Sequence, residues 1–226
     1  MLETLSLNNK GRQNFSLAMI GSGGHARSVF ALAKLVGLSP EVVISPDELS
    51  PLSPFASLRH IKEDEEITSF DPKFTELLNG VGHVSRASIR KKITGFYHSK
   101  GFKFLTLVSP TAFVCDGCVL SEGVQVFHGA IINAAVKIGA GTIVNNGVVV
   151  EHDCIIHDNV SISPNATLCG GVEVCSNVII GPGATIGKNV VIGRDAIIGA
   201  GASIVRDVPP NATILPVKPV IFKGSD

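Results

Sequence analysis

A six-residue repeat of aliphatic side chains runs through the second half of this 226-residue chain. Every sixth residue from Val114 to Ile204 is valine, leucine or isoleucine, and none of the sixteen positions breaks the pattern. Four residues after these positions, from Cys118 to Ala202, stands a small or β-branched residue. An α-helix cannot produce this period, because 3.6 residues per turn would spread the aliphatic side chains around its surface. A simple strand would repeat every two residues and would need hairpin turns.

Short strands joined by tight turns around a triangular prism do produce a period of six. Each aliphatic residue then points inward, and each small residue lies at a corner, where space is least. The pattern resembles the hexapeptide-repeat family of left-handed parallel β-helices, in which three hexads make one coil. Sixteen hexads give a little over five coils, and a prism roughly 25 Å tall at ~4.8 Å per coil. We therefore expect an all-β left-handed parallel β-helix over 109–208 and a C-terminal tail over 209–226.

The first half of the chain lacks this period and predicts a separate domain over 15–108. Apolar runs bounded by turn residues indicate strands, and apolar residues at helical spacing indicate helices. Strands are predicted over 15–20, 41–45, 81–84 and 102–108, and helices over 25–36, 72–79 and from Ser85 to Gly101. Alternating strands and helices are typical of a small parallel α/β domain of Rossmann-like type.

A glycine-rich turn, Gly21-Ser22-Gly23-Gly24-His25, links the first predicted strand to the first helix. Such a turn exposes backbone N–H groups at a helix N-terminus, which suits phosphate groups. It is not a G-x-G-x-x-G sequence, and no acidic residue lies at a convincing dinucleotide distance. By itself it is equally well explained as a structural tight turn.

Three segments in a fixed order add a more specific resemblance. They are I-G-S-G-G-H-A-R-S-V (20–29), S-I-R-K-K-I (88–93) and V-E-H-D-C-I-I (150–156). Together with the β-helix they resemble bacterial sugar O- and N-acetyltransferases, which comprise sialic acid O-acetyltransferases and UDP-4-amino-sugar N-acetyltransferases. The resemblance implies a nucleotide-sugar-binding domain, an acetyl-CoA-binding β-helix and a homotrimer.

Acetyl transfer needs a base of pKa near 7 for the acceptor and donors for the oxyanion that forms on the thioester carbonyl. His152 follows the inward Val150 by two residues and is expected to point outward from a turn. Asp153 beside it could orient the imidazole. One coil further on lies Gly170, which would leave room for a thioester. A solvated turn histidine is the alternative reading.

The resemblance also implies roles for individual residues. It makes His152 the general base, with Asp153 as its partner and Asn145 as a nearby polar group. The implied acetyl-CoA contacts are Gly170, Ser161, Pro182 and Ala200, and the implied acceptor contacts are Gly23, Gly24, His25, Asp47 and Ser85. Ser161 stands where the family usually has a second histidine. Packing explains Pro182 and Ala200 about as well, and His25 needs no role beyond its place at a helix start.

Two other histidine patterns are present in the sequence. The spacing of His152 and His157 invites comparison with gamma-class carbonic anhydrases, which bind zinc on a β-helix. The positions one and two coils before His152 are Ala134 and Asp116, which supply no third histidine. We therefore expect no metal, and His128 is interpreted as a surface residue.

The basic segment and the cysteines are interpreted as structural features. Residues 82–110 hold six lysines and arginines and no acidic residue. This segment is interpreted as a solvated helix face, with phosphate binding as the alternative. The five cysteines, among them the inward-facing Cys118 and Cys154, do not space like a disulfide framework and are expected to pack as free thiols. A reducing, cytoplasmic location is therefore expected.

Composition excludes several classes. Nineteen basic and nineteen acidic residues give a formal net charge of zero, which argues against nucleic-acid binding. The chain has no run of ~18 apolar residues that would predict a membrane span. Its first fifteen residues lack the apolar core of a signal peptide.

The leading hypothesis is transfer of acetyl from acetyl-CoA to the amino group of a UDP-4-amino sugar in surface-glycan synthesis. O-acetylation of a sialic-acid-like sugar is the alternative within enzymes, because the same base would serve a hydroxyl. A non-catalytic trimeric nucleotide-sugar-binding scaffold is the alternative from another class.

Overall fold

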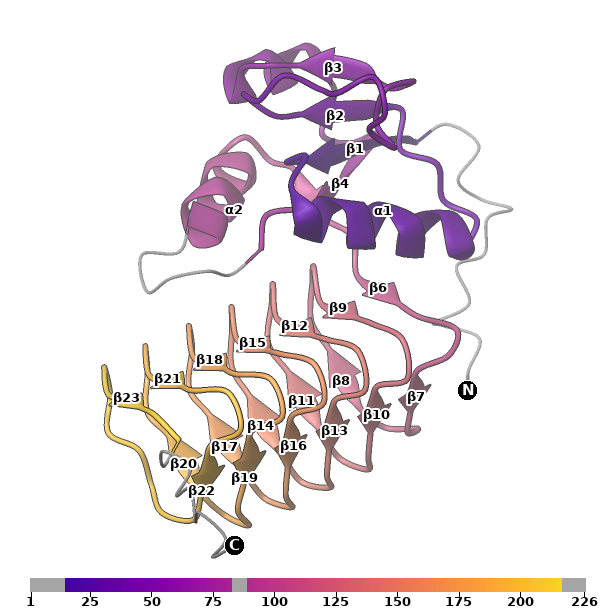
Figure 1. Cartoon of the computed structure of the whole chain (residues 1–226). Helices are drawn as coiled ribbons and strands as arrows, with labels where there is room; N and C mark the ends of the chain where they lie inside the picture. Colours follow the sequence, from indigo (N-terminus) through magenta and orange to yellow (C-terminus); the bar gives the residue numbers. More distant parts are fainter. Residues whose placement is uncertain (1–14, 83–88, 217–226) are drawn as a thin grey trace, which may run out of the picture.

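The computed structural model describes residues 15–82 and 89–216. It shows a small α/β domain packed against the first coils of a long parallel β-solenoid, as predicted (Figure 1). Val84, the end of a predicted strand, lies outside the described residues. So does Ser85, which was predicted to start a helix and to contact the acceptor.

The α/β domain is built on a five-stranded, wholly parallel sheet of order β3-β2-β1-β4-β5. Its strands are β1 (Ser16–Ile20), β2 (Val42–Ile44), β3 (Arg59–Ile61), β4 (Thr75–Asn79) and β5 (Lys103–Phe104); its helices are α1 (Gly24–Leu35), α2 (Ile89–Ser99) and the 3-10 helix η3 (Asp64–Ser69).

Both faces of this sheet are covered, which explains why its inner strands β1 and β2 are apolar on both sides. Leu17 and Met19 of β1 pack with α1, whereas Ala18 and Ile20 pack with η3 and with Tyr97 of α2. This alternation follows from the two-residue period of a strand.

Three sequence predictions for this domain differ from the structure. The segment 72–79 was predicted as a helix, but Thr75–Asn79 is the strand β4, which pairs with β1 over five residues. The single strand predicted over 102–108 is two short strands in different sheets, because β5 pairs with β4 and Leu107–Val108 pairs with the solenoid. Val81 and Gly82 lie in no strand.

The solenoid has three parallel sheets, and each strand pairs with the strand 18 residues further on wherever the repeat is regular. One sheet holds β6 (Leu107–Val108), β9 (Gln125–Val126), β12 (Ile143–Val144), β15 (Ser161–Ile162), β18 (Ile179–Ile180), β21 (Ile197–Ile198) and β23 (Thr213–Ile214). The second holds β7 (Phe113–Val114), β10 (Ile131–Ile132), β13 (Val149–Val150), β16 (Thr167–Leu168), β19 (Thr185–Ile186) and β22 (Ser203–Ile204). The third holds β8 (Val119–Leu120), β11 (Lys137–Ile138), β14 (Ile155–Ile156), β17 (Glu173–Val174) and β20 (Val191–Ile192).

The predicted inward column forms the solenoid core. The repeated aliphatic residues from Val126 to Ile204 and the small corner residues from Val124 to Ala202 are buried in one continuous cluster. Cys154 occupies a fully buried corner as a free thiol, and burial raises its pKa to about 11. The cysteine therefore behaves as a packing residue.

A third column, not used in the sequence analysis, makes the corners possible. The residue just before each small corner residue has a positive φ at every corner from Gly117 to Gly201. These positions are glycine, asparagine or aspartate in all cases except Ala135, because these residues tolerate the left-handed region best. Asp153, with φ of +62°, belongs to this column.

Candidate active site

The predicted base lies on one edge of the prism, at the corner between β13 and β14. The His152 side chain is 56% exposed, so the ring points outward as predicted. Its Nδ1 lies 2.8 Å from Oδ2 of Asp153. A carboxylate only accepts hydrogen bonds, so the neutral ring donates from Nδ1 and keeps a lone pair on Nε2. The left-handed corner thus places a carboxylate beside a histidine whose outer nitrogen can take a proton.

Gly170 lies directly beside this ring, one coil further on. A Cβ at position 170 would come within 2.7 Å of both Cε1 and Nε2 of His152. The glycine therefore leaves bare backbone next to the nitrogen that would accept a proton. His152, Asp153 and Gly170 are the residues that the structure brings together as predicted.

Other residues of the predicted site lie elsewhere on the same chain. Asn145, Pro182 and Ala200 belong to the edge formed by the corners between the first and second sheets, where Pro182 and Ala200 are exposed. The Asn145 side chain accepts a hydrogen bond from the Asn146 amide at 2.9 Å. Ser161 lies within β15 and is 8% exposed. Within one chain, these residues do not share a corner with His152.

The glycine-rich turn lies at the carboxyl end of β1, where α1 begins. Gly23 is the N-cap, and it and Gly24 are exposed with open space where a Cβ would stand. The Ser22 hydroxyl lies 2.8 Å from that of Ser45, which directly follows the neighbouring β2, and the exposed Asp47 comes two residues later. The turn therefore offers unobstructed N–H groups beside the end of β2.

His25 faces the solenoid. Its Nε2 lies 2.8 Å from Oε1 of Gln125 in β9, and its ring stacks edge-on against Phe127 at 5.7 Å. Gln125 in turn donates to the carbonyl of Asn79 at 2.8 Å. Burial, with a smaller contribution from the positive charge of Arg90, lowers the pKa of His25 to about 4. His25 is thus a neutral contact between the two domains at pH 7.

Arg90 was missed by the sequence analysis. It falls in the segment interpreted as a solvated helix face, yet it is 1% exposed, so that interpretation is wrong for this residue. Its guanidinium donates to the carbonyls of Asn79, Val81 and Gly141, tying the α/β domain to a solenoid corner. The helical spacing of Ile89, Ile93 and Phe96 marked one apolar face and gave no sign that an arginine beside it is buried.

Further features concern the surface role of His128, metal binding and membrane-spanning helices. His128 is exposed and bonds to Ser109, as expected of a surface residue. Within residues 15–82 and 89–216, no group of three metal-ligating side chains comes together. The same described portion holds no helix that is long and apolar enough to span a bilayer.

The solenoid matches a known class of repeats. A family model described as bacterial transferase hexapeptide (six repeats) matches residues 153–188 and 176–206. No curated protein sequence matches the chain significantly. The left-handed parallel β-helix and its repeat place the chain among the hexapeptide transferases.

Similar solved structures narrow this class. The acetyltransferase domain of PglB from Neisseria gonorrhoeae FA1090, in complex with acetyl coenzyme A, is 31% identical with a TM-score of 0.82, and the match covers 92% of this chain and all of that domain. PerB from Caulobacter crescentus, in complex with CoA and GDP-perosamine, is 30% identical with a TM-score of 0.80, covering 92% and 97%. WeeI from Acinetobacter baumannii AYE, at 24% identity and a TM-score of 0.77 over 89% and 96%, shares the fold. This chain belongs to the bacterial sugar acetyltransferases of the hexapeptide superfamily.

Proposed function

We propose that this acetyltransferase moves the acetyl group of acetyl-CoA to the amino group of a nucleotide-linked 4-amino sugar, with His152 as general base. The amine nitrogen attacks the thioester carbonyl, and the carbon–sulfur bond then breaks. The proton lost by the amine passes to Nε2 of His152 and from there to the departing CoA sulfur. The products are an N-acetyl sugar and CoA with a free thiol.

The pair of His152 and Asp153 beside Gly170 is the observation that carries this proposal. The 2.8 Å contact at Nδ1 orients the ring and would stabilise the imidazolium formed during the reaction. Nε2 is the free nitrogen, and the bare backbone at Gly170 leaves space next to it for a thioester. A general base in this geometry typically contributes about 10²- to 10⁴-fold to a rate.

For acetyl-CoA, we propose contacts at Gly170, Ser161, Pro182 and Ala200, with Asn145 as a nearby polar group. Asn145, Pro182 and Ala200 lie on a different edge of the prism from His152. A homotrimer would place the edge of one chain beside the edge of the next, so the complete site would lie between subunits. The similar PglB domain was solved with acetyl coenzyme A, which supports this cosubstrate.

The acceptor is proposed to bind at the glycine-rich turn. The free N–H groups of Gly23 and Gly24 at the start of α1 suit the pyrophosphate, and Asp47 at the end of β2 would contact the nucleoside. His25 lies behind this turn and would hold it in place through its hydrogen bond with Gln125. The similar PerB was solved with CoA and GDP-perosamine, which supports a nucleotide-linked amino sugar. UDP as the nucleotide is proposed from the sequence resemblance.

The test is thiol release from acetyl-CoA with a UDP-4-amino-4,6-dideoxy sugar, GDP-perosamine and a free sialic acid as acceptors. We expect release with a nucleotide-linked amino sugar and a loss of about 10²-fold or more in the His152→Ala variant. His157→Ala is the matched control and should keep its rate. His157 is an exposed histidine at the next corner of the chain, and it pairs with Glu173 of β17.

Other outcomes would redirect the assignment. Release with the sialic acid alone would favour O-acetylation. Acceptor binding without thiol release would favour the non-catalytic scaffold, and an unchanged rate in His152→Ala would reject His152 as the base.

A further inference from the structure

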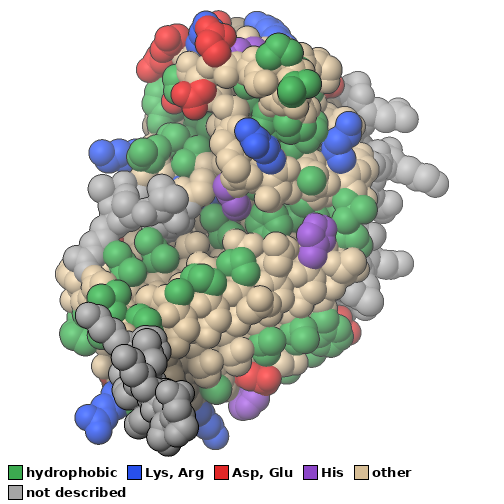
Figure 2. Space-filling model, viewed as in Figure 1, with side chains coloured by type: hydrophobic (Ala, Val, Ile, Leu, Met, Phe, Trp, Pro, Cys, Tyr) green, Lys and Arg blue, Asp and Glu red, His purple; other side chains and the backbone are tan. Residues whose placement is uncertain are grey.

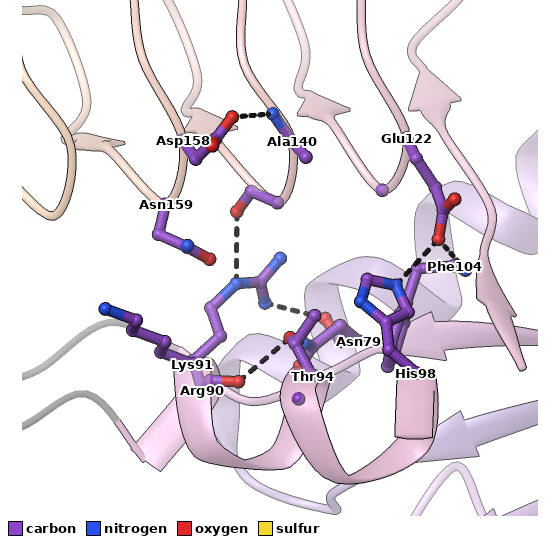
Figure 3. A pocket seen from close by; sticks show the side chains of 13 residues that line it. Asn79, Arg90, Lys91, Thr94, His98, Phe104, Glu122, Ala140, Asp158 and Asn159 are labelled. Atoms are coloured by element: carbon purple, nitrogen blue, oxygen red, sulfur yellow. Dashed lines mark hydrogen bonds and ion pairs between the residues drawn. The ribbon is translucent and has the colours of Figure 1, made fainter. Parts of the chain in front are cut away.

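A pocket of about 290 Å³ lies between α2 and the solenoid corners that precede β9, β12 and β15 (Figure 3). It is separate from the corner that carries His152. Its walls combine Phe104 and Gly95 with polar side chains of both domains. The other lining residues include Arg90, Glu122, Gly123, Gly141 and Asp158.

Arg90 is the most deeply buried charge at this pocket. Its Nη1 donates to the carbonyls of Asn79 at 3.1 Å and Val81 at 2.7 Å, and its Nε donates to that of Gly141 at 3.3 Å. Among the described residues, nothing accepts a hydrogen bond from Nη2, although this nitrogen is buried. In Figure 3 the terminal nitrogen without a dashed line points into the space between α2 and the corners.

The charge of Arg90 also lacks a partner within the described part of the chain. All of its bonds go to neutral carbonyls, and none of the ion pairs found there includes it. Burial without a counter-charge is costly, and it lowers the pKa of this guanidinium to about 9. An anion in the pocket would supply both the missing acceptor and the missing charge.

The acidic side chains at the pocket are already engaged. Glu122 accepts from His98 and from the Phe104 amide, both at 2.9 Å, and Asp158 accepts from the Ala140 amide at 2.8 Å. Their negative charges at the rim disfavour a doubly charged phosphate. A single carboxylate that reaches Nη2, with an apolar body beside Phe104, fits these walls best.

We propose that this pocket binds a small organic acid, with its carboxylate on Nη2 of Arg90. The inference rests on the pocket itself and does not depend on the proposed function. Butyrate and butyramide make a matched pair of probes, because they have nearly the same shape and only butyrate carries the charge.

The test uses the whole protein and amide chemical shifts with calorimetry. We expect butyrate to bind and to shift the amides of Gly123 and Gly141, with butyramide at least tenfold weaker. Arg90 is a buried structural contact, so the blocking variant is Gly95→Leu, where a Cβ meets open space. Gly95→Leu should weaken butyrate binding at least tenfold, and Gly95→Ala should change it little.

Each other outcome would overturn the proposal. Equal binding of the acid and the amide would show that the charge is not recognised. Binding that Gly95→Leu leaves unchanged would place the acid at another site, and no butyrate binding would mean that Arg90 serves only to join the two domains.

Discussion

At the scale of single residues, Asp153 has both a backbone role and a side-chain role. Its φ of +62° belongs to the left-handed column that turns every corner, and its carboxylate bonds to Nδ1 of His152. Asparagine fills the same column at other corners, for example at Asn159 and Asn165. The backbone role and the side-chain role can therefore be separated by substitution.

We predict that Asp153→Asn keeps the free energy of unfolding but lowers kcat/KM about tenfold or more. Asparagine carries no negative charge, so the imidazolium that forms on His152 during the reaction loses its stabilising partner. Asp153→Val, a β-branched residue at positive φ, should also lose about 1–2 kcal/mol of stability. A wild-type kcat/KM in Asp153→Asn would show that the aspartate only shapes the turn.

Gly170 provides a second prediction at this scale. In Gly170→Ala the new Cβ would overlap the His152 ring, and the half-exposed ring would swing away. Stability should change by less than about 1 kcal/mol because position 170 is outside the left-handed region, whereas activity should fall about tenfold to a hundredfold. Urea denaturation and thiol-release kinetics measure the two effects. Full activity would mean that the ring need not stay beside this backbone.

At the scale of elements, His25 has a structural role that its sequence position did not indicate. It was predicted as an acceptor contact in a glycine-rich turn, and the structure sets it between α1 and β9. Its burial depends on Phe127 and Gln125, about one hundred residues away. No local pattern could have signalled that contact.

We predict that His25 makes stability fall in mild acid. Its pKa is about 4 in the folded chain against 6.5 in the unfolded chain, so folding favours the neutral ring. The contribution is complete above pH 6.5 and is lost as pH falls from 6.5 to 4, because only the unfolded chain then takes up the proton. The loss should approach about 3 kcal/mol. Unfolding measured across this range should show a shallower slope in His25→Gln, and parallel slopes would contradict the assignment.

The strand β4 is the element that local reasoning assigned wrongly. Its residues Thr75–Asn79 were predicted as part of a short helix, but they pair with β1 in the middle of the sheet. Leu77 and Leu78 are fully buried on opposite faces of that sheet. A short apolar run fits either structure locally, and pairing with β1 decided between them.

At the scale of the whole molecule, the proposed site is divided between edges of the prism. Figure 2 shows hydrophobic side chains exposed on the solenoid face below the α/β domain. Outward residues on the other faces are also apolar, with Phe113 56% exposed and Val119 54% exposed. These surfaces and the separation of Asn145 from His152 favour an assembly in which chains complete one another's sites.

We predict a trimer of about three times 23.6 kDa by sedimentation equilibrium. If His152 of one chain works with Asn145 of another, an equal mixture of His152→Ala and Asn145→Ala chains, unfolded and refolded together, should recover about a quarter of wild-type activity. Random mixing leaves one interface in four intact. The two variants assembled separately and then combined are the control. A monomer, or no recovery in mixed trimers, would contradict the shared site.

The sequence alone was enough for the solenoid, because each hexad carries its own inward residue and its own corner residue within six positions. It also sufficed to place His152 and Asp153 outward on one corner and Gly170 one coil on, since a period of 18 converts sequence distance directly into position. Only the tertiary structure could bury Arg90, set His25 against Gln125 and make β4 a strand. Those outcomes depend on contacts between the two domains or across the sheet, and such contacts leave no periodic mark in the chain.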